Sequence, residues 1–168
     1  MNKKILVILI AMFALVGGAV FLFAGDKQSS DASLAKVEAQ EVSVTPESYD
    51  IGRVLMKDGI VTREYEIKNS SSNTLRIKNI ATSCMCTRAQ VILGDKRTRL
   101  YSMEMSGAKN PNVDFDIPGG QSAKLVVKFD PAAHGPAGVG KVDRVVSLTF
   151  LDPVGTRQVA FSGEVVLQ

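Results

Sequence analysis

Apolar and polar residues alternate at every second position over long stretches of the chain after residue 60, and this period limits the possible folds. In "VTREYEIKN", Val61, Tyr65 and Ile67 share one parity while polar residues occupy the other. The stretch "TLRIKNI" repeats the pattern with Leu75 and Ile77. A period of two indicates strands with one buried and one solvated face. Because the polar turn "SSSN" separates the two segments, we expect them to pair as an antiparallel hairpin.

Three more segments near the C-terminus have the composition of strands: "SAKLVVKFD", "DRVVSLTFLD" and "TRQVAFSGEVVLQ". Each is bounded by Gly, Pro, Asn or Asp, and no convincing amphipathic helix lies between them. Short strands without helical crossovers predict an all-β fold, an antiparallel two-sheet sandwich. Residues 91–116 form a long irregular insertion, which we expect to be a loop or to contain an extra hairpin.

The N-terminus has a different character, because twenty residues from Ile5 to Ala24 run without a charge behind Lys3 and Lys4. This length suits a spanning helix better than the shorter apolar region of a cleaved signal peptide. We therefore predict a transmembrane or signal helix over residues 1–24, with cleavage near Ala24 as the alternative. The two lysines hold the N-terminus in the cytoplasm, which makes the rest of the chain extracytoplasmic.

Residues 25–41 are small and polar and predict a flexible tether, followed by one domain over residues 42–168. The formal net charge is +3, and beyond the two N-terminal lysines basic and acidic residues are almost equal in number. A nucleic-acid-binding protein needs a clustered basic face. We therefore expect no nucleic-acid partner.

The chain has two cysteines, Cys84 and Cys86, separated only by Met85. If this segment were extended, two rises of about 3.3 Å would hold the sulfurs too far apart for a disulfide. A disulfide therefore requires a turn or bulge, and would be strained and easily reduced. Because extracytoplasmic compartments are oxidising, export of the domain favours formation of the disulfide. Simple packing of two small apolar side chains is the alternative that leaves no activity.

A soft-metal site is a further interpretation of the same cysteines. Cu(I) prefers thiolate and thioether ligands, whereas Zn prefers four ligands, most often Cys and His. The candidate ligands are Cys84, Cys86, His134, Met103 and Met105. Methionines more often fill gaps in a core, and a histidine beside "GPAG" is more often an exposed loop residue. We keep Cu or Zn as an alternative to the expectation of no cofactor.

Catalysis finds little support in the sequence. There is one histidine, no thioredoxin-like CxxC, no GxSxG and no HExxH. Redox catalysis would need a cysteine thiolate with a lowered pKa, for example beside a cation. Arg88 follows Cys86 by two positions and could share its strand face, but one cation near a cysteine is common by chance. We predict that the protein is not an enzyme and has no catalytic residues.

Four spaced segments together resemble a known family: "YDIG" at 49–52, "EYEIKNSSSNTLRIKNIATSCMCT" at 64–87, "DIPGGQSAKLVVKFDP" at 116–131 and "HGPAGVG" at 134–140. The chain resembles the DUF1573 family of exported bacterial proteins over roughly residues 42–166. It has Met85 where that family usually has Gly, and a longer segment after Cys86. The resemblance implies an immunoglobulin-like sandwich related to the ASPM/SPD-2/Hydin type of domain, and no established reaction.

Together these observations predict a single-pass protein of the inner membrane whose domain lies in the periplasm, or a secreted domain after cleavage. We expect a non-catalytic module that binds or supports a protein partner in the cell envelope, in addition to its membrane contact. The alternative is a soft-metal (Cu or Zn) or thiol-binding module centred on Cys84 and Cys86.

Overall fold

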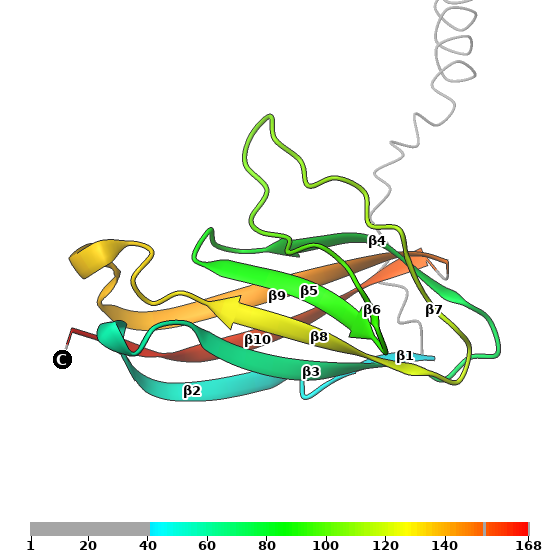
Figure 1. The fold of residues 1–168 in the computed structure, drawn as a ribbon, viewed down its shortest axis with the longest axis horizontal. Helices are drawn as coiled ribbons and strands as arrows, with labels where there is room; N and C mark the ends of the chain where they lie inside the picture. The colour runs from blue at the N-terminus through cyan, green and yellow to red at the C-terminus, as the bar shows by residue number, and fades with distance from the viewer. Residues whose placement is uncertain (1–40, 153, 168) are drawn as a thin grey trace, which may run out of the picture. The chain divides into compact units, whose positions relative to one another are not determined.

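The structure is a computed structural model that describes residues 41–152 and 154–167 (Figure 1). Ten strands form two five-stranded sheets. In spatial order the first sheet contains β1 (Val42–Thr45), β3 (Val61–Asn69), β8 (Ser122–Phe129), β5 (Thr87–Leu93) and β6 (Lys96–Arg97). The second contains β2 (Ser48–Leu55), β10 (Val154–Val166), β9 (Gly140–Asp152), β4 (Leu75–Thr82) and β7 (Phe115–Ile117). The prediction of an all-β, two-sheet fold is confirmed.

Helical structure in the described residues is limited to two short 3-10 turns, η1 (Met56–Asp58) and η2 (Gly135–Gly138). The helix expected over residues 1–24 and the tether expected over 25–41 lie outside the described residues, apart from Glu41. Within the described ranges, no helix has the length and apolar character needed to cross a membrane.

The alternating pattern correctly predicts which side chains point inward. Tyr65, Ile67, Leu75 and Ile77 are all buried, and in β8 the alternate residues Leu125, Val127 and Phe129 are buried, together with Val126. The rings of Phe129 in β8 and Phe161 in β10 lie 5.3 Å apart, so the inner faces of the two sheets pack on each other. The core therefore lies between the sheets.

A buried hydroxyl also links the sheets. Tyr65 Oη, in β3, donates a hydrogen bond of 2.7 Å to the carbonyl of Ala160 in β10. Burial, assisted by the nearby Tyr49, raises the pKa of Tyr65 to about 12. The neutral phenol is therefore the form that the fold favours.

The expectation of purely antiparallel sheets is wrong for one pair of strands. β10 runs parallel to β2, with Phe161 opposite Tyr49, whereas all other described pairs are antiparallel. The two residues Pro46 and Glu47 carry the chain from β1 in one sheet to β2 in the other. Because β2 does not pair with its sequence neighbours, nothing forces it to be antiparallel.

The predicted hairpin between residues 61–69 and 74–80 is also wrong. β3 pairs with β1 and β8, whereas β4 pairs with β7 and β9 in the other sheet. The two strands lie in different sheets and are not hydrogen-bonded neighbours. Alternation reveals which face of a strand is buried but not which strand lies beside it.

The connection between β3 and β4 is a buried polar corner, which we call the Asn69 corner. Asn69 Nδ2 donates to the carbonyls of Asn73 (2.8 Å) and Ile117 (3.0 Å). Asn69 Oδ1 accepts hydrogen bonds from the backbone N–H and the hydroxyl of Ser71 (3.2 and 2.8 Å). The side chain of Asn69 is fully buried. The "SSSN" stretch is thus part of a sheet-to-sheet crossover.

The long insertion contains both predicted features. β5 and β6 form a short hairpin, with Leu93 opposite Lys96, and an irregular loop leads from there to β7 (Figure 1). Asn110 holds the loop against β4, because its Nδ2 donates to the carbonyls of Ile80 (3.0 Å) and Ser102 (2.8 Å). The loop thus lies beside the end of β4, where the cysteines follow.

Candidate functional site

The two cysteines lie in the turn that carries the chain from β4 back to β5 in the other sheet, which we call the cysteine turn (residues 83–86). The backbone N–H of Thr87 donates to the carbonyl of Cys84 at 3.1 Å, which closes the turn. The hydroxyl of Thr82 lies 2.9 Å from the same carbonyl. This bend brings the two cysteine Cα atoms to 5.3 Å, within the range of a disulfide.

Cys84 and Cys86 form a disulfide in this turn. The expectation that such a bond needs a bend is confirmed. Cys86 is only 3% exposed, whereas Cys84 is half-buried. The backbone N–H of Cys86 donates to Cys84 Sγ at 3.3 Å. One sulfur of the pair is therefore more accessible than the other.

His134 approaches the disulfide from the end of β8. The backbone N–H of Asp130 donates to the carbonyl of Cys86 at 2.9 Å, which ties the end of β8 to the cysteine turn. The carboxylate of Asp130 then accepts from the N–H of Ala132 at 2.9 Å and shapes the following loop. His134 Nε2 lies 3.3 Å from Cys84 Sγ. A disulfide sulfur carries no hydrogen, so Nε2–H must be the donor.

Arg144 approaches from the opposite sheet. Ser83 N–H donates to the carbonyl of Val145 (2.9 Å), and Val145 N–H donates to the Ser83 hydroxyl (3.0 Å), which extends the pairing of β4 and β9 into the turn. Arg144 Nε donates to Cys86 Sγ at 3.3 Å, and its Nη1 donates to the Asp143 carbonyl at 2.8 Å. Among the described residues, no carboxylate forms an ion pair with Arg144.

Three of the five predicted metal ligands come together. The sulfurs of Cys84 and Cys86 and a ring nitrogen of His134 all lie within 4.8 Å of one another. In the disulfide, both sulfurs share their electrons with each other, so this set can hold a metal only after reduction. The ligand role of Met103 and Met105 remains a prediction.

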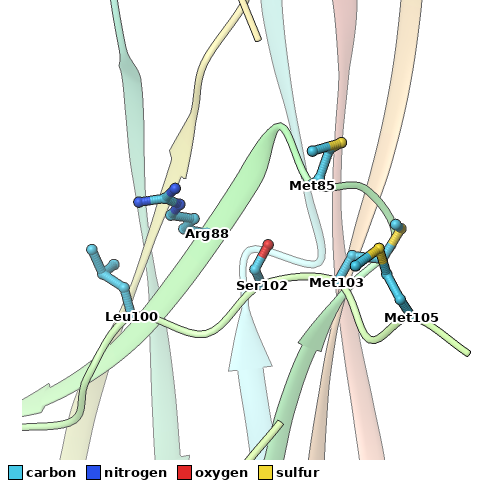
Figure 2. Close-up of a pocket in the computed structure, with 6 residues that line it drawn as sticks. All are labelled: Met85, Arg88, Leu100, Ser102, Met103 and Met105. Atoms are coloured by element: carbon cyan, nitrogen blue, oxygen red, sulfur yellow. The ribbon is translucent and has the colours of Figure 1, made fainter. Parts of the chain in front are cut away.

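Met103 and Met105 line a hollow of about 350 Å³ beside the cysteine turn (Figure 2). Figure 2 shows the methionine side chains on one side and those of Arg88 and Leu100 on the other. The full lining is Met85, Arg88, Leu100, Ser102, Met103 and Met105. Met85 and Met105 are 59% and 61% exposed. Met85 of the cysteine turn therefore lines the same hollow as the two methionines of the insertion.

Arg144 was not predicted from the sequence. It lies 58 positions from Cys86, and only the pairing of β9 with β4 brings it near the sulfurs. The register Thr82 opposite Val146, continued by two residues, places position 144 opposite position 84. No local motif around "KVDRVV" carries this information.

The solved structures that resemble this chain support the fold alone. A protein of unknown function from Porphyromonas gingivalis W83 has a TM-score of 0.52 and 18% identity, covering 73% of this chain and 46% of its own. A family 123 glycoside hydrolase from Clostridium perfringens has a TM-score of 0.51 and 7% identity, covering 73% of this chain and 23% of its own. This chain thus spans less than half of either relative. No curated protein matches the sequence.

The family comparison covers the N-terminal half of the domain. The match begins at Val42 and contains β1 to β5 with both cysteines, while His134 and Arg144 lie beyond its end. The resemblance to the family is therefore confirmed where its most specific element, "SCMCT", lies. Residues 42–96 of this chain match the family described as "Protein of unknown function (DUF1573)".

Proposed function

We propose that this protein is a non-catalytic, immunoglobulin-like module that binds a protein partner in the cell envelope. The observation that carries the proposal is the methionine-lined hollow beside the cysteine turn. Methionine side chains are flexible and polarisable, and surfaces that bind peptides use them for this reason. Exposed apolar side chains gathered around one hollow are a feature of interaction sites.

The chemistry of the hollow indicates what it binds. Met85, Met103 and Met105 offer an apolar surface, and Arg88 adds a positive charge at the rim. Within the described part of the chain, the guanidinium of Arg88 forms no ion pair. A peptide segment with one apolar side chain beside a carboxylate matches both features. We propose such a segment of a partner protein as the ligand.

The location of this binding rests on the sequence. The apolar run at residues 5–24 supports a single-pass anchor in the inner membrane, with the domain in the periplasm. Cleavage near Ala24 would instead release the domain as a secreted protein. In either case the partner is extracytoplasmic, and nucleic acid is not proposed as a ligand.

A library of random, cysteine-free peptides displayed on phage tests the proposal with the full-length chain. We expect selected peptides to share an apolar residue next to Asp or Glu. Met105→Glu should weaken their binding at least about tenfold, because it places a charge in the apolar surface. The control Ile60→Glu alters an apolar residue of similar exposure outside the hollow and should leave the affinity unchanged. Selected peptides that bind Met105→Glu as tightly as the parent contradict the proposal.

A second candidate function is supported by the cluster of Cys84, Cys86 and His134. After reduction these residues offer two thiolates and one imidazole. Cu(I) accepts such a soft, low-coordinate set, whereas Zn would need a fourth ligand. We therefore favour Cu(I) over Zn.

Reduced full-length protein, incubated separately with Cu(I) and Zn(II) and then desalted, tests this candidate. Elemental analysis should find copper equimolar with the chain, with loss of the copper in Cys84→Ser and weaker retention in His134→Ala. Reduced protein that retains neither metal excludes it.

A further inference from the structure

We propose that the Cys84–Cys86 disulfide accepts electrons from a dithiol of an extracytoplasmic protein, by thiol–disulfide exchange that begins at Cys84. This step goes beyond the peptide binding proposed above and needs no metal. It rests on two side chains, His134 in the loop after β8 and Arg144 in β9, that contact the two sulfurs separately.

The difference in exposure selects the sulfur that is attacked. An incoming thiolate must approach a disulfide sulfur directly, so access decides between the two. Cys86 is 3% exposed, whereas Cys84 is half-buried at the surface of the turn. The partner thiolate therefore bonds to Cys84 Sγ, and the Cys84–Cys86 bond breaks with its electron pair left on Cys86 Sγ.

Arg144 is in position to stabilise the negative charge that this step creates. Its Nε–H already points at Cys86 Sγ from 3.3 Å, and the Thr87 hydroxyl lies 3.7 Å from the same sulfur. A hydrogen bond from a guanidinium to an anionic acceptor is stronger than one to a neutral acceptor. Arg144 is not engaged by a carboxylate among the described residues, so its charge is available to the departing thiolate.

A second thiol of the partner completes the reaction. It attacks the partner sulfur bound to Cys84, which closes a disulfide in the partner and releases Cys84 Sγ with the electron pair. His134 Nε2–H, 3.3 Å from that sulfur, donates a hydrogen bond to it. Two electrons and two protons pass from the dithiol to Cys84 and Cys86, and the partner leaves oxidised.

The site of attack is tested on the oxidised full-length chain with glutathione as the probe. The reaction is stopped early with N-ethylmaleimide, and fragment-ion mass spectrometry locates the two adducts. We expect glutathione on Cys84 and maleimide on Cys86. Glutathione found mainly on Cys86 overturns the proposal, because the buried sulfur would then be the one attacked.

The role of Arg144 is tested by the second-order rate of the same reaction. Arg144→Met should slow it about tenfold, because a charge-assisted hydrogen bond to the leaving sulfur is lost. Arg144→Lys should restore most of the rate. The control Arg97→Met removes a cation from β6, away from the disulfide contacts, and should react like the parent. An unchanged rate in Arg144→Met, with denaturant unfolding that shows the variant to be folded, overturns this role.

The outcomes also separate this proposal from the peptide-binding function. Cysteine-free peptides cannot exchange with the disulfide, so their affinity reports only on the hollow. Met105→Glu should lose peptide binding yet keep the parental rate with glutathione. A loss of exchange in Met105→Glu would show that the disulfide reacts only through the hollow. It would overturn the proposal that exchange is an activity separate from peptide binding.

Discussion

Among the corners that carry the chain from one sheet to the other, two are built in different ways. The Asn69 corner joins β3 to β4 through neutral hydrogen bonds around one buried amide. The cysteine turn joins β4 to β5 through a covalent bond, and a histidine and an arginine contact its sulfurs. A crossover can thus be stabilised by neutral polar groups alone. The two side chains that contact the sulfurs exceed what the crossover requires, and the proposed thiol–disulfide exchange gives them a role.

The largest effect is expected from Asn69→Ala. This change removes the donor to the buried Ile117 carbonyl and the acceptor of the Ser71 N–H, and should lower the free energy of unfolding by about 3 kcal/mol. The matched control Asn73→Ala removes an exposed side chain and should cost less than about 0.5 kcal/mol. Urea unfolding measures both. Equal losses would show that the amide of Asn69 does not hold its corner.

A smaller effect is expected when the disulfide is removed. It spans a sequence separation of only 2, so the chain entropy it removes from the unfolded state corresponds to about 1.5 kcal/mol. Unfolding of the parent with and without reductant should show this loss, and Cys84→Ser/Cys86→Ser should be insensitive to reductant. A loss of unfolding free energy as large as that of Asn69→Ala would show that the disulfide stabilises the fold as much as the Asn69 corner does.

Tyr65 provides a link between the sheets that lies outside both corners. Tyr65→Phe removes the hydrogen bond to Ala160 and should cost about 1 kcal/mol. The pKa of Tyr65 is raised from 10.0 to about 12, so its contribution is complete below pH 10 and is lost as the pH rises towards about 12. Unfolding across this range, in the Cys84→Ser/Cys86→Ser background, should show a steeper decline with Tyr65 than with Phe. If the free energy of unfolding fell equally with pH in both proteins, the raised pKa of Tyr65 would be contradicted.

The smallest effect on stability is expected from His134→Ala. His134 is exposed, so its loss should change the free energy of unfolding by less than about 0.5 kcal/mol. Chemical denaturation of the oxidised protein measures this value. A loss comparable to that of breaking the disulfide would mean that His134 serves the turn itself, and would weaken the contrast between the corners.

Local patterns were sufficient to predict the strands but not their neighbours. Period-two alternation identified β3, β4 and β8 and their buried faces, because burial depends on the parity of each residue. The same pattern led to a false hairpin, because strands in different sheets show the same alternation as strands that pair. The buried role of Asn69 was missed for a related reason. A polar stretch rich in serine is typical of an exposed turn, and only the fold encloses it.

The candidate site was predictable only where it is local. That a disulfide between Cys84 and Cys86 needs a bend followed from the rise of an extended strand, and His134 was already among the possible ligands. Arg144 depends on the register of β9 against β4, which no spacing in the sequence reveals. That Met85 lines the same hollow as Met103 and Met105 likewise depends on the turn and on the path of the insertion.

The backbone hydrogen bonds around the cysteine turn determine what happens after the disulfide opens. Ser83 is held by Val145 of one sheet, and the carbonyl of Cys86 is held by Asp130 of the other. Neither bond involves sulfur, so both persist when the sulfurs separate. The freed thiols therefore keep a high effective concentration with respect to each other, and the turn is prepared to close again. A partner joined to Cys84 by one sulfur would be displaced by Cys86 unless its own second thiol reacted first.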